Sequence, residues 1–315
     1  MSHIPERSVA RPRISIVVPA LNEARNLEVV LPELPPVYEV ILVDGTSTDG
    51  TVETALRVLP TVKIVKQTRR GKGNALVCGF EAASGDVVVM FDADGSADPA
   101  EIHRFVEALR DGADFAKGSR ALEAGGSQDI TVLRSWGNRV MTSITNLLFR
   151  TGYTDLRYGY NAFWRDVLGL LDLPSPTAGT RVWGDGFEIE TVLNCRVAAA
   201  GLIVREVASV ERPRIYGASN LHAVRDGLRV LKTIVTERWV CRSLGRRRAP
   251  AAPRRIVAVY TSSVEVPVAS PANPTPWTGV GDVPAGMAQR RMPGERVAVS
   301  GILPDGVPTP LVPAS

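Results

Sequence analysis

Short apolar runs alternate with amphipathic segments in the first third of the chain. Four of the runs have the length and composition of strands: residues 14–18, 39–43, 62–65 and 87–91. The first and the fourth are so continuously apolar that both of their faces must be covered. Helical periodicity follows each run, at residues 23–34, 51–59, 73–83 and 99–110. This order predicts an α/β fold with a parallel sheet and helices on both faces, in which ligands bind at the carboxyl ends of the strands.

Polar residues and a proline mark the starts of these helices. Asn22 is a plausible cap of the first helix, and Asp49 precedes the second. Pro99 suits a first-turn position with Asp98 as its cap.

The pattern between residues 119 and 240 is more mixed. Helices are expected at 130–150 and 187–200, and strands at 159–164 and 202–207. A last helix is indicated by apolar residues that recur every three or four positions: Leu221, Val224, Leu228, Leu231 and Val235. From Cys241 onward the chain is rich in Pro and Gly and has no periodic segment long enough to fold. We therefore expect a flexible N-terminus at 1–12, one folded domain at 13–240 and a disordered basic tail at 241–315.

Charge is distributed unevenly along the 315 residues. The formal net charge is +4 and the isoelectric point is near 9.1, values that by themselves suggest a nucleic-acid-binding protein. Residues 241–315 hold nine Arg and four acidic residues, however, so the basic excess belongs to the tail. A nucleic-acid-binding tail predicts aromatic residues among the cations, whereas Tyr260 and Trp277 lie outside the Arg cluster. No nucleic-acid partner is expected.

The sequence also bears on compartment. The first 13 residues lack an apolar signal core, and no stretch of 18 apolar residues is present. The three cysteines form no metal-binding or disulfide pattern, which favours a cytoplasmic protein with reduced thiols. A basic amphipathic last helix and the Arg-rich tail suit peripheral contact with the cytoplasmic face of a membrane. The alternative, which the narrow apolar stripe favours, is a helix packed on the core or on a partner subunit.

The strongest chemical signal is the pair Asp92 and Asp94, which follows the fourth apolar run. Two carboxylates at the end of a buried strand are costly unless a cation neutralises them. Oxygen ligands suit Mg²⁺ or Mn²⁺, which commonly bridge to a diphosphate. The alternative is a turn with two solvated acids.

Three further segments fall at the same predicted edge of the sheet. Asp44 could accept hydrogen bonds from a ribose or a base, or could open an Asx-turn. Asn22 and Glu23 could face a nucleotide or cap a helix. The loop from Arg69 to Asn74 places three cations and two glycines before a helix N-terminus, which favours an anion site or a solvated basic loop.

Taken together, seven segments in this order resemble the family-two glycosyltransferases of GT-A fold. They are VPALNE at 18–23, VDGTSTDGT at 43–51, GKGNA at 71–75, DAD at 92–94, GSR at 118–120, GDGFE at 184–188 and PRIYGASNL at 213–221. The later segments look most like the dolichol- or polyprenyl-phosphate mannosyltransferase and glucosyltransferase branch. The resemblance covers about residues 12–240.

The resemblance implies a role for each matching residue. A nucleotide pocket would be lined by Pro19, Asn22, Glu23 and Asp44. The metal on the donor diphosphate would be held by Asp92 and, more closely, Asp94. Positive charge on the phosphates would come from Lys72, Arg120 and Arg214. The transferred sugar or the acceptor loop would be met by Glu188.

Three positions depart from the family pattern. Gly45 and Ser96 stand where the family often has Asp and Gln, and Asn220 replaces a lysine expected in the late motif. These departures bear on the donor and the acceptor more than on the reaction class.

The resemblance implies an inverting, metal-dependent hexosyltransferase. Its donor would be a nucleoside-diphosphate sugar of the GDP-mannose or UDP-glucose type. Its acceptor would be a polyprenyl phosphate, oriented by cations such as Arg120 and Arg134, or a soluble hydroxyl compound that needs a carboxylate base. A sugar-1-phosphate nucleotidyltransferase is a second reading, but its Gly-rich loop after the first strand is missing. A catalytically silent scaffold is another alternative.

Overall fold

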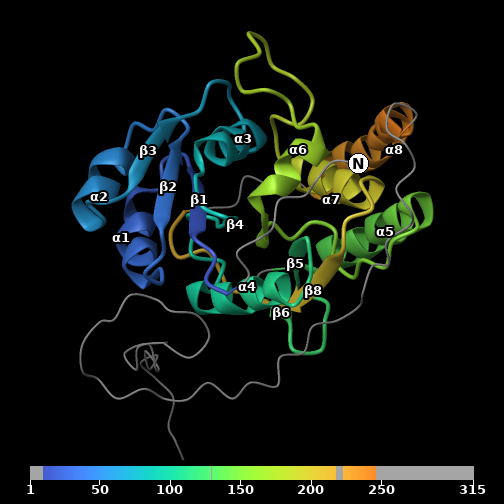
Figure 1. Cartoon of the computed structure of the whole chain (residues 1–315), viewed down its shortest axis with the longest axis horizontal. Helices are drawn as coiled ribbons and strands as arrows, with labels where there is room; N and C mark the ends of the chain where they lie inside the picture. Colours follow the sequence, from blue (N-terminus) through green and yellow to red (C-terminus); the bar gives the residue numbers. More distant parts are fainter. Residues whose placement is uncertain (1–9, 129, 218–222, 246–315) are drawn as a thin grey trace, which may run out of the picture.

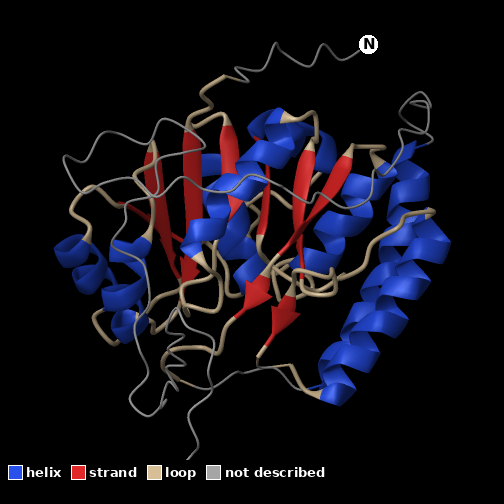
Figure 2. Ribbon diagram, turned by 90° about the horizontal axis from the view of Figure 1, so that it is seen from below, coloured by secondary structure: helices blue, strands red, loops and turns tan. Residues whose placement is uncertain are grey.

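The structure is a computed structural model that describes residues 10–128, 130–217 and 223–245. A seven-stranded sheet runs through it in the order β3-β2-β1-β4-β7-β5-β8, with helices on both sides (Figures 1 and 2). The strands are β1 (Ile14–Ala20), β2 (Glu39–Asp44), β3 (Lys63–Lys66), β4 (Val87–Met90), β5 (Phe115–Ser119), β7 (Asn161–Trp164) and β8 (Val204–Ala208). A second, two-stranded sheet pairs β6 (Gly126–Ser127) with β9 (Val210–Glu211).

The central strands confirm the predicted parallel sheet. Val17 of β1 pairs with Ile41 of β2 on one side and with Met90 of β4 on the other, both in parallel register. Nearly every residue of these three strands is buried, because helices cover both faces of the sheet.

Two features of the sheet differ from the sequence prediction. Strand β5 was not expected, since Lys117 and Gly118 interrupt its apolar pattern. Strand β7 runs antiparallel to both β4 and β5, so the sheet is mixed. The strand direction is set by long-range pairing and has no signature in the local pattern.

The helices lie close to their predicted positions. They are α1 (Ala24–Glu33), α2 (Thr51–Val58), α3 (Lys72–Ala82), α4 (Ile102–Arg110), α5 (Val132–Phe149), α6 (Leu168–Leu171), α7 (Ile189–Ala199) and α8 (Ala223–Gly245). Helix α6 was not predicted. Asp98 caps the 3-10 turn Pro99–Glu101 as expected, with its carboxylate accepting from the amide of Ala100. Among the described residues, no helix is both long enough and apolar enough to cross a bilayer.

Helices α3 and α4 cover opposite faces of the sheet. Phe80 of α3 meets the Phe163 ring edge-on, whereas Phe105 of α4 packs on Tyr160. Side chains alternate between faces along an extended segment, so positions 160 and 163 point to opposite sides.

Helix α8 differs from its prediction in two ways. It continues to Gly245, beyond the expected domain boundary at residue 240, and Cys241 is buried. It also packs through Val230, Ile234 and Cys241, while Leu228 and Val235 of the expected inward stripe are exposed. Leu221 and Asn220 lie outside the described residues, as do residues 1–9 and 246–315 of the expected terminal segments.

At Gly79, helix α3 lies directly against β1 and β2. A Cβ atom at Gly79 would lie 2.3 Å from Val17 Cγ1 and 3.0 Å from Val43 Cγ2. The absence of a side chain therefore sets how near α3 approaches β1 and β2.

We expect Gly79→Ala to destabilise the fold by about 1–3 kcal/mol, because overpacking outweighs the better helix propensity of alanine. Gly137→Ala is the matched control, since Gly137 is also helical and has nothing within 4 Å of the added Cβ. Urea unfolding of both variants checks this. Equal stability of the two variants would show that α3 can move away from the sheet without cost.

Candidate active site at the carboxyl edge of the sheet

The carboxyl ends of β2, β1 and β4 meet at one edge because these three parallel strands are neighbours. The structure thereby brings together the segments that the sequence placed at strand ends. Asp44 ends β2, Asn22 and Glu23 follow β1, and Asp92 follows β4. Pro19 lies within β1 and pairs with Val43.

The loops after β1 and β2 are bound to each other by side-chain hydrogen bonds. Asp44 accepts hydrogen bonds from the amides of Thr46 and Ser47, both at 3.1 Å. These are the contacts of an Asx-turn, one of the two roles predicted for Asp44. Asn22, in the left-handed region at φ 58°, accepts from the amide of Thr48 at 2.9 Å.

Asn22 therefore does not cap α1, and that prediction is wrong. Asp49 accepts from the amides of both Ala24 and Thr51 at 3.0 Å, so one carboxylate from the second loop serves the starts of α1 and α2.

Asp92 is paired with a largely buried lysine. The Lys72 ammonium lies 2.8 Å from Asp92 and 2.9 Å from Glu190 of α7. Burial by itself lowers the pKa of Lys72, but the two carboxylates raise it above its ordinary value. The pKa of Asp92 is raised by burial and by the charges of Asp94 and Glu190, which together outweigh Lys72. Lys72 is thus a counter-ion within the acidic cluster.

Asp94 is held by a second cation from a distant segment. Its Oδ1 atom accepts from the amide and the hydroxyl of Ser96, at 3.0 and 2.7 Å. Its Oδ2 atom lies 3.2 Å from Arg214, whose guanidinium also pairs with Glu23 at 2.9 Å. The backbone after β9 lies alongside, because the amide of Ile215 donates to the carbonyl of Asp94.

These two groups form one acidic cluster: Glu23, Asp92, Asp94 and Glu190 with Lys72 and Arg214. Four carboxylates against two cations leave two negative charges when all are ionised. Space beside the cluster is kept by Gly159, where a Cβ atom would lie 3.6 Å from Asp92 Oδ2. Among the described residues no three His, Cys, Asp or Glu side chains form a ready metal cage. Two carboxylates with substrate phosphates completing the shell suit Mg²⁺ or Mn²⁺, so the cluster fits the expected ion.

The loop before α3 is docked on the loop before α7. Arg69 makes a two-point pair with Asp185, both contacts at 2.8 Å, and both side chains are nearly fully buried. Gly71 and Gly73 allow this contact, since added Cβ atoms would lie 2.1 Å and 1.8 Å from the carbonyl oxygens of residues 185 and 184. The basic loop is therefore not simply solvated. It ties two motifs more than a hundred residues apart.

Glu188 sits at the start of α7 with half of its carboxylate free of hydrogen bonds. Its Oε1 atom accepts from the amides of Gly184 and Gly186 at 3.2 Å. Its Oε2 atom is buried and has no hydrogen-bond partner among the described residues, with Arg229 Nε 3.7 Å away. This oxygen is an acceptor without a hydrogen bond at the start of α7.

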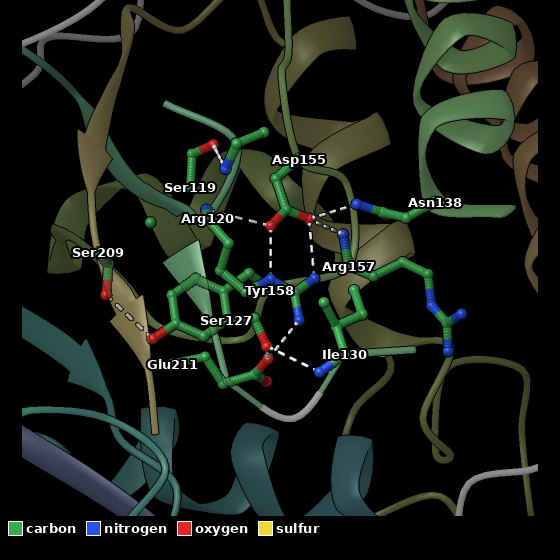
Figure 3. Close-up of polar contacts among 12 residues, drawn as sticks. Ser119, Arg120, Ser127, Ile130, Asn138, Asp155, Arg157, Tyr158, Ser209 and Glu211 are labelled. Atoms are coloured by element: carbon green, nitrogen blue, oxygen red, sulfur yellow. Dashed lines mark hydrogen bonds and ion pairs between the residues drawn. The ribbon is translucent and has the colours of Figure 1, made fainter. Parts of the chain in front are cut away.

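Arg120 has a different environment from the phosphate contact implied for it. It pairs with Asp155 at 2.7 Å and with Glu211 at 2.9 Å, and its guanidinium lies over the Tyr158 ring (Figure 3). Asn138 of α5 donates to the same Asp155. Burial alone raises the pKa of Asp155, but Arg120 holds it well below the ordinary range. Arg120 therefore joins the loop after β5 to β9 and, through Asp155, to α5.

Comparisons with known proteins agree with this geometry. The sequence pattern of glycosyl transferase family 2 matches residues 15–170. The polyprenol monophosphomannose synthase of Mycolicibacterium smegmatis is 30% identical over 220 residues, which cover 66% of this chain and 81% of that protein. The chain belongs to glycosyl transferase family 2.

Two further relatives extend the picture of this glycosyltransferase. The dolichol-phosphate mannosyltransferase of Pyrococcus furiosus is 36% identical over 121 residues, which cover 36% of this chain and only 34% of that protein. The glucosyl-3-phosphoglycerate synthase of Mycobacterium tuberculosis, solved with Mn²⁺, UDP-glucose and phosphoglyceric acid, has a TM-score of 0.57 at 23% identity. That likeness covers 76% of this chain and 86% of the synthase, and it confirms the expected GT-A fold.

Several residues that shape the glycosyltransferase site were missed in the sequence. Glu190 pairs with Lys72, and Asp155 pairs with Arg120. Lys117 is a fully buried lysine in β5. Burial lowers the pKa of Lys117, although the charges of Asp155 and Glu206 oppose that effect. Glu190 could have been suspected from its place two residues after Glu188, whereas nothing local distinguished Asp155.

We expect Arg120→Met to destabilise the fold by about 3–5 kcal/mol, because the substitution leaves Asp155 buried without its cation. Arg57→Met, which breaks an exposed pair with Glu28, should cost at most about 1 kcal/mol. Urea unfolding measures both values.

The loss in Arg120→Met should depend on pH in a defined direction. A depressed native pKa stabilises the fold above about pH 4, where an unfolded aspartate is ionised, and this stabilisation disappears as the pH falls below it. The difference between wild type and variant should therefore shrink in acid. A variant with wild-type stability but weaker phosphate-ligand binding would contradict this structural role.

Proposed function

We propose that this glycosyltransferase moves a hexosyl group, with inversion, from a nucleoside-diphosphate sugar to the phosphate of a polyprenyl phosphate. The acidic cluster at the end of β4 carries this proposal, since its two surplus negative charges suit a divalent ion on a diphosphate. The donor is of the GDP-mannose or UDP-glucose type. Two relatives, a dolichol-phosphate mannosyltransferase and a polyprenol monophosphomannose synthase, support the acceptor class.

The proposed metal site consists of Asp94 and Asp92. When bound there, Mg²⁺ or Mn²⁺ supplies Lewis-acid stabilisation of the departing diphosphate. Lys72 holds the Asp92 carboxylate in place and offsets part of its charge. Asp94 is the more direct ligand, because among the described residues its one cationic partner is the partly exposed Arg214.

The proposed donor site continues along the ends of β1 and β2. Asp44 and Asn22 fix the two loops on which a ribose and base would rest, with Pro19 at the end of β1 beneath them. Glu23 orients Arg214, whose positive charge would then lie beside the diphosphate as negative charge develops on it. Arg120 supports the site indirectly by holding β9, from which the chain runs on to Arg214.

A soluble hydroxyl acceptor is the second candidate, and one observation favours it. The free Oε2 atom of Glu188 could take a proton from a hydroxyl group, whereas an ionised phosphate acceptor requires no base. Under the leading proposal, the same oxygen accepts a hydrogen bond from the transferred sugar.

A transfer assay with radiolabelled GDP-mannose and UDP-glucose should separate the two candidates. We expect Mn²⁺-dependent label in a lipid fraction when a polyprenyl phosphate is supplied, and none with 3-phosphoglycerate. Glu188→Gln should keep at least about a tenth of the lipid-linked activity, because an ionised phosphate acceptor requires no general base. Loss of a general base would instead lower the activity roughly a hundredfold or more. Transfer only to a soluble acceptor, with Glu188→Gln inactive, would favour the second candidate.

We expect Asp94→Asn to lower transfer by about a hundredfold or more, because one of two metal-binding carboxylates is lost. GDP or UDP with Mn²⁺ should raise the melting temperature of the wild type and not of the variant, since a ligand at a hundred times its Kd stabilises by on the order of 3 kcal/mol. Asp111→Asn, at the exposed end of α4, is the control. Full wild-type activity in excess chelator would refute the metal proposal.

A further inference from the structure

Helix α5 carries large apolar side chains on the side away from the core, in addition to Met141, Ile144 and Leu148, which pack against it. Its buried side chains are polar: Asn138, Thr142 and Thr145. Its exposed side chains include large apolar ones, with Trp136 64% and Leu147 80% exposed. A surface helix ordinarily turns its apolar stripe inward, so α5 is built for apolar surroundings on its outer side.

The inner polar side chains of α5 are held by hydrogen bonds, although Asn138 Oδ1 has no partner among the described residues. Asn138 donates to Asp155 at 2.8 Å, and Thr142 bonds the carbonyl of Asn138 at 2.7 Å. Thr142 also accepts from the amide of Leu156. Rotating α5 to bury Trp136 would break the two bonds that connect it to Asp155 and Leu156.

Helix α8 packs beside α5 (Figure 1). It has a second exposed apolar stripe. Its inner side holds Ile234 and Glu237, and Glu237 pairs with Arg196 of α7 at 2.7 Å. Its outer side exposes Leu228 to 66% and Trp239 to 65%, with Val235 between them. The outer face is defined here by Leu133, Trp136 and Leu147 of α5 and Leu228, Val235 and Trp239 of α8.

The charge around the outer face is of one sign. Arg139, Lys232 and Arg242 are exposed on the two helices. Among the side chains described on α5 and α8, the one carboxylate is Glu237, which is buried against Arg196. A second copy of the chain would bring cations against cations, whereas anionic lipid headgroups would attract them. Tryptophan at the edge of an apolar face is also typical of a membrane–water boundary.

We propose that the outer face of α5 and α8 binds the surface of an anionic lipid bilayer. The apolar side chains enter the boundary between headgroups and acyl chains, and the flanking cations contact the headgroups. This proposal deepens the proposed function and rests on it for the use of a lipid-linked acceptor.

Helix α8 also borders the candidate active site. Arg229 of α8 lies 3.7 Å from Glu188, and the Lys232 ammonium lies 5.3 Å from the centre of the Trp183 ring. Bilayer contact through α8 would therefore bring residues 183–188 close to the headgroup region. A polyprenyl phosphate carries its phosphate at that depth, so docking would present the acceptor to the site.

Vesicle co-sedimentation of the full chain tests the face with three matched substitutions. Leu147→Glu on α5 and Leu228→Glu on α8 lie on the outer face, and Leu56→Glu on α2 replaces an exposed leucine elsewhere. On vesicles of phosphatidylcholine with phosphatidylglycerol, each outer-face variant should bind at least about fivefold more weakly, since it loses apolar contact and adds a repelled charge. Leu56→Glu should bind as the wild type does, and added salt should weaken binding of all three and of the wild type.

Several outcomes would overturn the proposal. Absence of wild-type binding to anionic vesicles is one. Unchanged binding of both outer-face variants, together with loss of binding on reversing the charges of Arg246, Arg247 and Arg248, would assign the contact to the tail. A wild-type dimer that Leu228→Glu converts to a monomer, without vesicle binding, would assign the face to self-association.

Turnover separates this proposal from the proposed function. We expect the outer-face variants to lose transfer to a long-chain polyprenyl phosphate in vesicles and to keep transfer to a short-chain analogue in detergent. Vesicle binding without turnover on any lipid phosphate would leave the face intact and refute the function. Turnover in vesicles that both Leu→Glu variants retain would refute the face and leave the function intact.

Discussion

The surplus of negative charge at the end of β4 is the constraint on which the site depends. Asp92 and Asp94 emerge from a strand that is buried on both faces, where unpaired carboxylates are strongly disfavoured. Lys72 from the start of α3 and Arg214 from beyond β9 supply the compensation. Each cation is shared with a further carboxylate, so the cluster keeps a surplus of negative charge.

This compensation also explains how distant segments become neighbours. Lys72 also pairs with Glu190 of α7, and the Arg69–Asp185 pair holds the start of α3 close to that helix. Gly71 and Gly73 permit the contact, since any side chain there would collide with the backbone of residues 184 and 185. The loop from Arg69 to Asn74 and the loop that leads into α7 are therefore one structural unit, and a change in either affects both.

A second buried pair connects the site to the surface. Arg120 and Asp155 join β9 to α5, and Asp155 binds α5 through Asn138. Hydrogen bonds hold the inner side of α5, and Trp136 and Leu147 remain on the outside. Helix α5 therefore takes part in pairing the buried charges on one side. On its other side it presents an apolar face flanked by basic residues to the exterior.

The sequence by itself determined the elements β1 to β4, the helices between them and the edge at which the acidic residues gather. Local periodicity carries that information, because a buried parallel strand and an amphipathic helix each have a characteristic period. Strand β5, with Lys117 in its middle, has no such period, and the direction of β7 depends on which strands flank it. The ordered motifs also indicated the family and the candidate residues.

Only the tertiary structure decided what those residues touch: that Lys72 binds Asp92 and Glu190, that Arg120 binds Asp155, and that Leu228 and Val235 face outward. Pairing of buried charges and the choice of a helix face are settled by contacts between segments far apart in sequence, which no local pattern contains.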